Sequence, residues 1–100
     1  MPARAILTPA QLSAWEVYVS DPIHLEADDL DDEYGPTAAE YRTAAGCLRG
    51  RRLVVPRDQF EQVDRVLTEA CNSADSEGTK AGNGAARALV NLADKLRRSE

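Results

Sequence analysis

The most chemically suggestive part of this sequence is an acidic run that places six carboxylates within eight positions. Carboxylates at this density could ligate calcium, share a proton in acid–base catalysis, or attract a basic partner by imitating a polyanion. The alternatives are an ordinary solvated face or a charge complement to the protein's own Arg49, Arg51 and Arg52. The acids are Glu26, Asp28, Asp29, Asp31, Asp32 and Glu33, and Tyr34 follows them directly.

Calcium binding and acid–base catalysis both fit this acidic run poorly. An EF-hand alignment that puts Glu40 at the last ligand position puts Asp29, Asp31 and Glu33 at the first three. Tyr34 then occupies the position where the calcium loop needs glycine for its sharp turn. A catalytic pair of carboxylates needs burial or mutual repulsion to separate the two pKa values, and nothing beside the run is apolar enough to bury it. We therefore expect no metal site here.

A partner-binding surface fits the acidic run better. In a short helix over residues 27–34, Leu30 and Tyr34 would share one side, and the acids would cover the others at spacings of about 5–6 Å. That density is of the order that a nucleic-acid backbone presents to Lys and Arg. We therefore predict that the run from Glu26 to Glu33, together with Tyr34, docks on a protein with a basic surface.

Other candidate motifs give no indication of catalysis or of a cofactor. Cys47 and Cys71 form no C-x-x-C pair, and no His or cationic cluster is recognisably placed to activate them, so we interpret both as reduced structural thiols. His24 lacks companions that would complete a metal-ligand set. The glycines over 78–84 follow no strand and lack the Gly-Lys-Ser/Thr ending of a phosphate loop. The sequence therefore predicts a protein that is not an enzyme and has no cofactor.

The charge is divided unevenly along the chain. Residues 5–41 hold nine acids and no Lys or Arg, whereas residues 42–57 hold five arginines and no acid. The net charge of −5, and the absence of aromatics among those arginines, argue against direct nucleic-acid binding. No segment is apolar over the length that a bilayer requires, and the N-terminus has no secretion signal. We expect a cytoplasmic protein that does not contact a membrane.

Four helices are predicted to carry these residues. Thr8 and Thr37 each precede a helical pattern as N-caps, with Gln11 and Glu40 three residues later. Trp15–Val19 also alternates like a strand, although we favour helix there. The second helix is expected to end at Gly50. Two further apolar stripes predict helices over 57–71 and 85–98.

The fold class that follows is a mainly α, single domain of 100 residues, with about four helices. Ala5–Leu7 and Leu53–Val55 are short and rich in branched residues, and they are expected to pair as a small two-stranded ribbon. Residues 72–84 contain three glycines and little to bury, so they predict a flexible loop within the domain.

The combined expectation is a small acidic protein-binding module. Its size and acidic bias are similar to those of compact inhibitors and regulators carried by phages and mobile elements, some of which occupy nucleic-acid-binding grooves, although no motif can be aligned. The alternative is a structural component whose apolar helical stripes pack against further copies of the chain. The apolar residues are rich in alanine, which contributes little burial energy, so self-association into a homo-oligomer is a second source of stability to consider.

Overall fold

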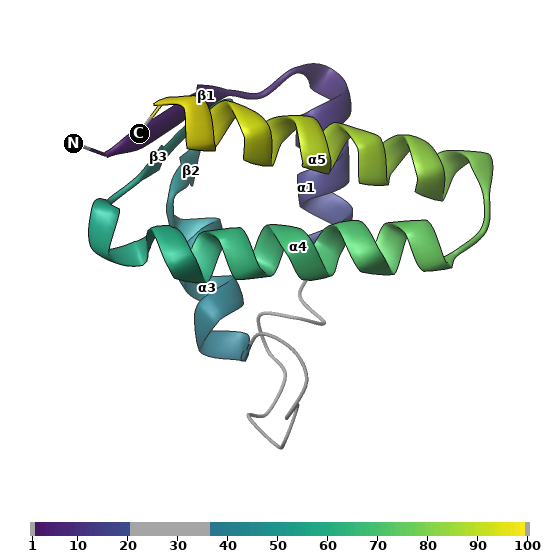
Figure 1. Ribbon diagram of the computed structural model, residues 1–100, viewed down its shortest axis with the longest axis horizontal. Helices are drawn as coiled ribbons and strands as arrows, with labels where there is room; N and C mark the ends of the chain where they lie inside the picture. The colour runs from purple at the N-terminus through teal and green to yellow at the C-terminus, as the bar shows by residue number, and fades with distance from the viewer. Residues whose placement is uncertain (1, 21–36, 100) are drawn as a thin grey trace.

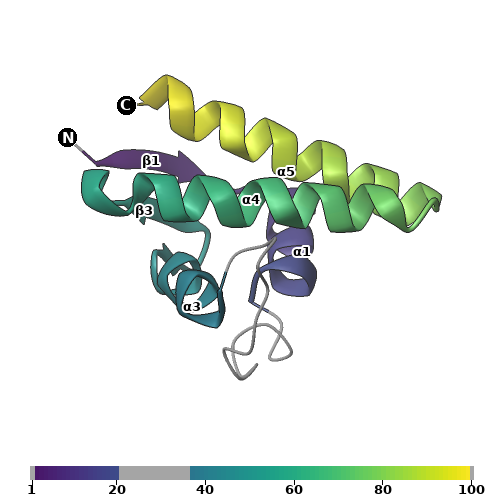
Figure 2. The same ribbon diagram turned by 60° about the horizontal axis from the view of Figure 1, so that its bottom comes forward.

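The computed structural model describes residues 2–20 and 37–99, which form four α-helices, one 3-10 turn and a three-stranded antiparallel sheet (Figure 1). The two longest helices, α4 (Phe60–Ser76) and α5 (Lys80–Ser99), lie side by side. Figure 2 shows α1 (Pro9–Tyr18) and α3 (Ala38–Gly46) beneath this pair. The prediction of a mainly helical single domain with a small sheet is confirmed.

The predicted ribbon is present as the larger part of the sheet. Strand β1 (Ala3–Ile6) pairs antiparallel with β3 (Arg52–Val55), and Ala5 stands directly opposite Leu53. A third strand, β2 (Leu48–Arg49), pairs with the other edge of β3, so the order is β1-β3-β2. This third strand was not predicted from the sequence.

The predicted end of the second helix at Gly50 is wrong. Helix α3 ends at Gly46 with Cys47 as its C-cap, and the chain turns directly into β2. Gly50 has φ +63° and is the first of the two residues that connect β2 to β3. A two-residue hairpin turn needs positive φ at such a position, and glycine adopts it without strain. The glycine therefore marks a hairpin rather than a helix end.

The predicted helix caps are present at both threonines. The Thr8 hydroxyl accepts from the Gln11 backbone N–H at 3.2 Å, and the Gln11 side chain accepts from the Thr8 N–H at 3.0 Å, which completes a capping box. The Thr37 hydroxyl accepts from the Glu40 N–H at 3.2 Å. Because α1 continues to Tyr18, the stretch that could have been a strand is helical.

The flexible loop predicted for residues 72–84 is not what the structure contains. Helix α4 continues to Ser76 and α5 starts at Lys80, so three residues connect them. The Thr79 hydroxyl accepts from the Gly82 N–H at 2.9 Å and thereby caps α5. A Cβ at Gly82 would stand 2.4 Å from the Ala74 carbonyl oxygen. Gly82 therefore permits close packing of α4 and α5. The glycines in this segment do not indicate a flexible loop.

The core lies between the sheet and the helices. Trp15, Leu7, Leu53 and Leu89 are fully buried, and the apolar stripes of α4 and α5 face the same interior. Two ion pairs tie the helices together, from Arg65 on α4 and from Arg97 on α5, and they are described with the site below. None of the described helices has the length and apolar character needed to cross a bilayer.

Candidate functional site

The partner-binding residues predicted from the sequence lie outside the described residues. This applies to the whole acidic run and to the tyrosine that follows it, and the same is true of His24. The described part of the chain brings a different set of charges together, on the solvent-facing side of the sheet. The residues predicted to dock on a partner are Glu26, Asp28, Asp29, Asp31, Asp32, Glu33 and Tyr34.

The sheet has an apolar inner face and a basic outer face because its strands alternate. In β1, Ala3 and Ala5 are buried while Arg4 and Ile6 are exposed. In β3, Leu53 and Val55 are buried, which turns Arg52 and Val54 to the other side. Residues directly opposite in register share a face, so the register adds Arg49 of β2. We call this set the arginine face: Arg4, Arg49 and Arg52, with Ile6 and Val54 between them.

The strand register fixes the layout of the arginine face. Ile6 stands opposite Arg52, and Arg52 stands opposite Arg49, so these three side chains form one row across the sheet. Arg4 stands opposite Val54 in the next row. Side chains directly opposite are about 5 Å apart at Cβ, and diagonal neighbours such as Arg4 and Arg52 are about 7–8 Å apart. The face therefore places Arg52 between Arg49 and Ile6, with Arg4 and Val54 in the neighbouring row.

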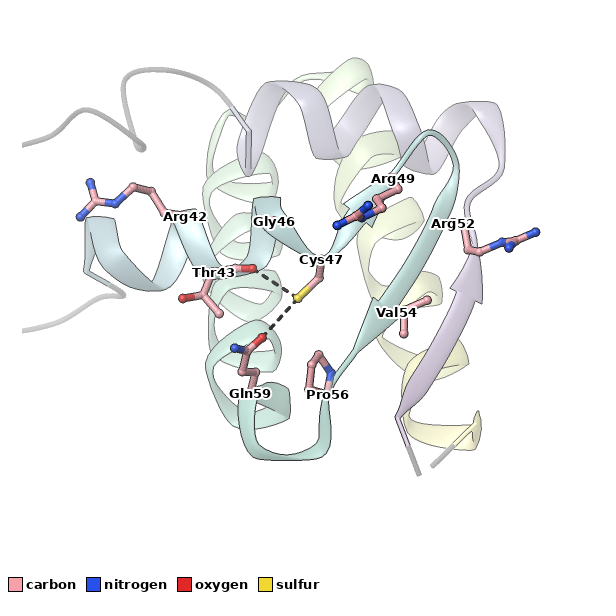
Figure 3. A pocket seen from close by; sticks show the side chains of 9 residues that line it. All are labelled: Arg42, Thr43, Gly46, Cys47, Arg49, Arg52, Val54, Pro56 and Gln59. Atoms are coloured by element: carbon pink, nitrogen blue, oxygen red, sulfur yellow. Dashed lines mark hydrogen bonds between the residues drawn. The ribbon is translucent and has the colours of Figure 1, made fainter.

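Three shallow cavities open along this face, and Arg52 lines each of them. One, of about 450 Å³, lies between the sheet and α3, and its lining includes Arg42, Arg49, Arg52, Cys47 and Gln59 (Figure 3). The second and third, of about 400 and 540 Å³, lie against Ile6. Among the described residues, no acidic side chain lines any of the three.

The arginines of this face differ from those of the helices in their partners. Arg65 donates to both carboxylate oxygens of Glu40, at 3.1 and 3.0 Å, and Arg97 donates to Asp64 at 2.8 Å. Within residues 2–20 and 37–99, no carboxylate forms an ion pair with Arg4, Arg49 or Arg52. Arg51, in the hairpin turn, instead donates to the Leu7 carbonyl oxygen at 3.0 Å and holds the end of β1.

Cys47 lies inside the cavity beside α3 but is not activated there. Its thiol donates toward the Thr43 carbonyl at 3.3 Å and the Gln59 side-chain oxygen at 3.6 Å (Figure 3). Burial raises the pKa of Cys47, and burial likewise raises that of Cys71. Because the thiolate is the reactive form, a raised pKa lowers reactivity. Both cysteines are free thiols, as predicted from the sequence.

The edge of the sheet beside this face is already occupied. The Arg4 N–H donates to the Ser99 hydroxyl at 2.8 Å, and Lys95 donates to the Ile6 carbonyl at 2.9 Å. Both groups come from α5, so this helix covers the backbone of edge strand β1. Addition of a further strand at that edge is blocked. A ligand would meet side chains on the face rather than backbone on the edge.

Chemically, the arginine face can bind anions. Guanidinium groups donate paired hydrogen bonds to carboxylate or phosphate, and the aliphatic side chains between them add apolar contact. In the described residues, no group of three His, Cys, Asp or Glu side chains could hold a metal ion.

Only part of this surface was predicted from the sequence. Arg49, Arg51 and Arg52 form a recognisable basic segment, whereas Arg4 and Ile6 are indicated only by the alternation in "ARAI", which turns both to the same side. The "LRGRRL" pattern around a central glycine is also typical of a tight hairpin. Comparison of the chain with protein-family models, curated proteins and solved structures found no match.

Proposed function

We propose that this chain is a protein-binding module, without enzymatic activity of its own, that recognises its partner by charge. The observation that carries the proposal is the separation of charge between two parts of the chain. The described residues hold all twelve Lys and Arg but only nine of the seventeen acids, a net charge of +3. Residues 21–36 hold seven acids and no base, a net charge of −7. A small chain with this division presents fields of both signs to a partner.

The acidic run is the proposed docking element for a basic partner. Its charge density would speed encounter with a surface rich in Lys and Arg and would set the orientation of the complex. A surface of this kind suits an inhibitor or regulator that covers the nucleic-acid-binding site of its target. For the run itself, the proposal rests on the sequence pattern.

The two cysteines support a binding role over a catalytic one. They are the strongest nucleophile candidates in the described part of the chain, and burial raises the pKa of both thiols. Neither therefore has the lowered pKa of a catalytic cysteine.

Self-association through the helical stripes has less support. The apolar residues of those stripes, such as Val66, Leu67, Leu89 and Leu92, are buried in the core of the same chain. The exposed large apolar residues of the described chain, Ile6, Val17 and Val90, lie on three different elements. Light scattering over a concentration series tests this alternative, which a strict monomer would exclude.

The test of the proposed function is neutralisation of the acidic run. A variant with Asp28, Asp29, Asp31 and Asp32 replaced by Asn should lose the proteins that the unaltered chain captures from host lysate at low salt. High salt should release the same proteins from the unaltered chain, because ions screen the attraction. Circular dichroism checks that the variant keeps its helices.

A matched control removes the same charge elsewhere. Replacement of Glu16, Glu61, Glu69 and Asp75 by Gln or Asn changes the net charge equally, on helices α1 and α4. This control should keep its partners. If the aspartate variant retains the same partners with the same salt dependence, the acidic run does not dock and the proposed function is wrong.

A further inference from the structure

We propose that the arginine face is a second docking surface, which takes an acidic peptide segment of a partner protein that carries aliphatic side chains among its carboxylates. This goes beyond the proposed function, which depends on the acidic run, because the arginine face belongs to the described fold and has the opposite charge. The two surfaces would let one chain contact a basic and an acidic element at once.

The first argument is charge left without a partner. Arg49 and Arg52 stand directly opposite each other on neighbouring strands, where like charges destabilise a sheet. No described carboxylate relieves this repulsion, although the same fold pairs Arg65 and Arg97 with good geometry. An anion bound by either arginine would reduce the repulsion. The face is therefore more favourable with an acidic ligand than without one.

The second argument is the apolar surface between the arginines. Ile6 is 62% exposed, the highest exposure of any large apolar residue in the described chain. Val54 is half-buried in the adjoining row. Both lie within the cavities that Arg52 also lines. Aliphatic side chains at these positions would contact the apolar residues of a peptide while the guanidinium groups bind its carboxylates.

The spacing also suits an extended peptide. Alternate side chains of an extended chain are about 6.6 Å apart. The diagonal between Arg4 and Arg52 is about 7–8 Å, so carboxylates two residues apart could reach both. Because α5 covers the outer edge of β1 through Ser99 and Lys95, a peptide near Arg4 and Ile6 would lie on the face and would not extend the sheet from β1.

Nucleic acid fits this surface less well than a peptide. Proteins that hold single strands stack the bases on exposed aromatic rings, and the residues that line the three cavities include no aromatic. Trp15 and Tyr41 are buried in the core.

The experiment measures binding of a labelled peptide by fluorescence anisotropy. The probe is a synthetic decapeptide of Asp, Glu, Leu and Val, in an order that does not occur in this chain, because it combines carboxylates with aliphatic side chains. The receptor is the full chain with the four aspartates of its own run replaced by Asn, so that this run does not compete. We expect saturable binding at low salt that weakens as salt rises.

Substitutions distinguish binding at the arginine face from non-specific electrostatic attraction of the peptide to the whole protein. Replacement of Arg4, Arg49 and Arg52 by Gln should weaken peptide binding at least about tenfold, and Ile6→Ser should weaken it several-fold. The control replaces Lys80, Arg87 and Arg98 of α5 by Gln, which removes the same charge from another element. This control should bind the peptide nearly as well as the receptor does. Equal weakening in both triple variants would show non-specific attraction and overturn the proposal.

A second measurement does not depend on substitutions. Amide chemical shifts of the labelled receptor should change on peptide addition at residues 3–6 and 48–55, and changes confined to other elements would contradict the proposal. An oligonucleotide that binds more tightly than the peptide and displaces it would make the face a nucleic-acid surface instead. A salt-sensitive dimer that the triple arginine substitution dissociates, with no binding of free peptide, would make the occupant a second copy. Either result would overturn the assignment to a partner peptide.

Discussion

Arginines serve two different purposes in the helical layer and on the sheet of this protein. Arg65 and Arg97 lie on α4 and α5 and bind carboxylates of neighbouring helices, at 3.0 and 2.8 Å. Arg49 and Arg52 stand opposite each other on adjacent strands and pair with no carboxylate of the described chain. The first pair of residues connects elements of the fold. The second pair places like charges on adjacent strands, and it is this pair that we propose binds an external anion.

This difference indicates that the helical layer contributes mainly to stability, whereas the outer face of the sheet is free to contribute to binding. In the helical layer, charged residues and a glycine hold the helices together. Ion pairs connect α3 to α4 and α4 to α5, and Gly82 allows α5 to pack closely on α4. In the sheet, side chains alternate between two faces. Alanine, leucine and valine point into the core, and the residues on the outer face are not constrained by packing. Substitutions in the first region should therefore change stability, and those in the second should change binding.

The largest effect on stability is expected at Gly82. A Cβ there would stand 2.4 Å from the carbonyl oxygen of Ala74, a backbone atom that cannot move without separating α4 from α5. We expect Gly82→Ala to lower the free energy of unfolding by about 2–3 kcal/mol, measured by urea denaturation.

Gly84 provides the matched control, because it lies in the same helix and a Cβ there meets nothing within 4 Å. Gly84→Ala should raise the free energy of unfolding by roughly 0.5–1 kcal/mol through helix propensity. Two stabilising substitutions would show that α4 and α5 are not in close contact at Gly82.

A smaller effect should separate the two kinds of arginine. Arg97 binds Asp64 and lies 3.5 Å from Asp94, but it is about half exposed, so Arg97→Gln should cost about 0.5–1 kcal/mol in the free energy of unfolding. Arg52→Gln should leave stability unchanged or raise it by a few tenths of a kcal/mol, because it removes a like charge opposite Arg49. Urea denaturation of both variants checks the comparison. A larger loss at Arg52 than at Arg97 would contradict it.

The smallest effect concerns pH and the contact between α1 and the end of α4. The Tyr18 hydroxyl donates to the Glu77 carboxylate, and this hydrogen bond raises the pKa of Tyr18 above its usual value of 10.0. Since the folded-state pKa is the higher one, the bond stabilises the fold below pH 10 and is lost as pH rises through the raised value.

The measurement compares the unaltered chain with Tyr18→Phe between pH 7 and pH 11. The unaltered chain should be more stable by about 0.5 kcal/mol or less at pH 7, because the contact is exposed. That advantage should disappear above pH 10. An advantage that persists at pH 11 would show that the phenol proton is not responsible.

Local signals predicted much of the fold. The threonine caps at positions 8 and 37 gave the starts of α1 and α3, and the apolar stripe after residue 57 gave α4. Short branched segments around Ala5 and Leu53 gave the pairing of β1 with β3. These predictions succeeded because each depends on residues close together in the chain or on one clear periodicity.

Two predictions based on glycines are wrong, for different reasons. Gly50 predicts a helix end, but it turns the hairpin between β2 and β3, and the surrounding "LRGRRL" pattern is a local signal for that turn. The glycines over 78–84 predict a flexible loop, but Gly82 lies against the Ala74 carbonyl of another helix. Only for Gly82 does the contact that requires glycine lie on another helix, and the residue type alone does not indicate such a contact.

By itself, the sequence determined the helical class, the caps, the buried stripes and the division of charge along the chain, since all of these follow from residue types at short spacing. Only the tertiary structure decided that Arg4 joins Arg49 and Arg52, which are more than forty residues away, on one face around Ile6. The physical reason is strand register. Side chains alternate with a period of two, so the hydrogen-bonded alignment of three strands, and not the order of residues in the chain, sets which charges share a surface.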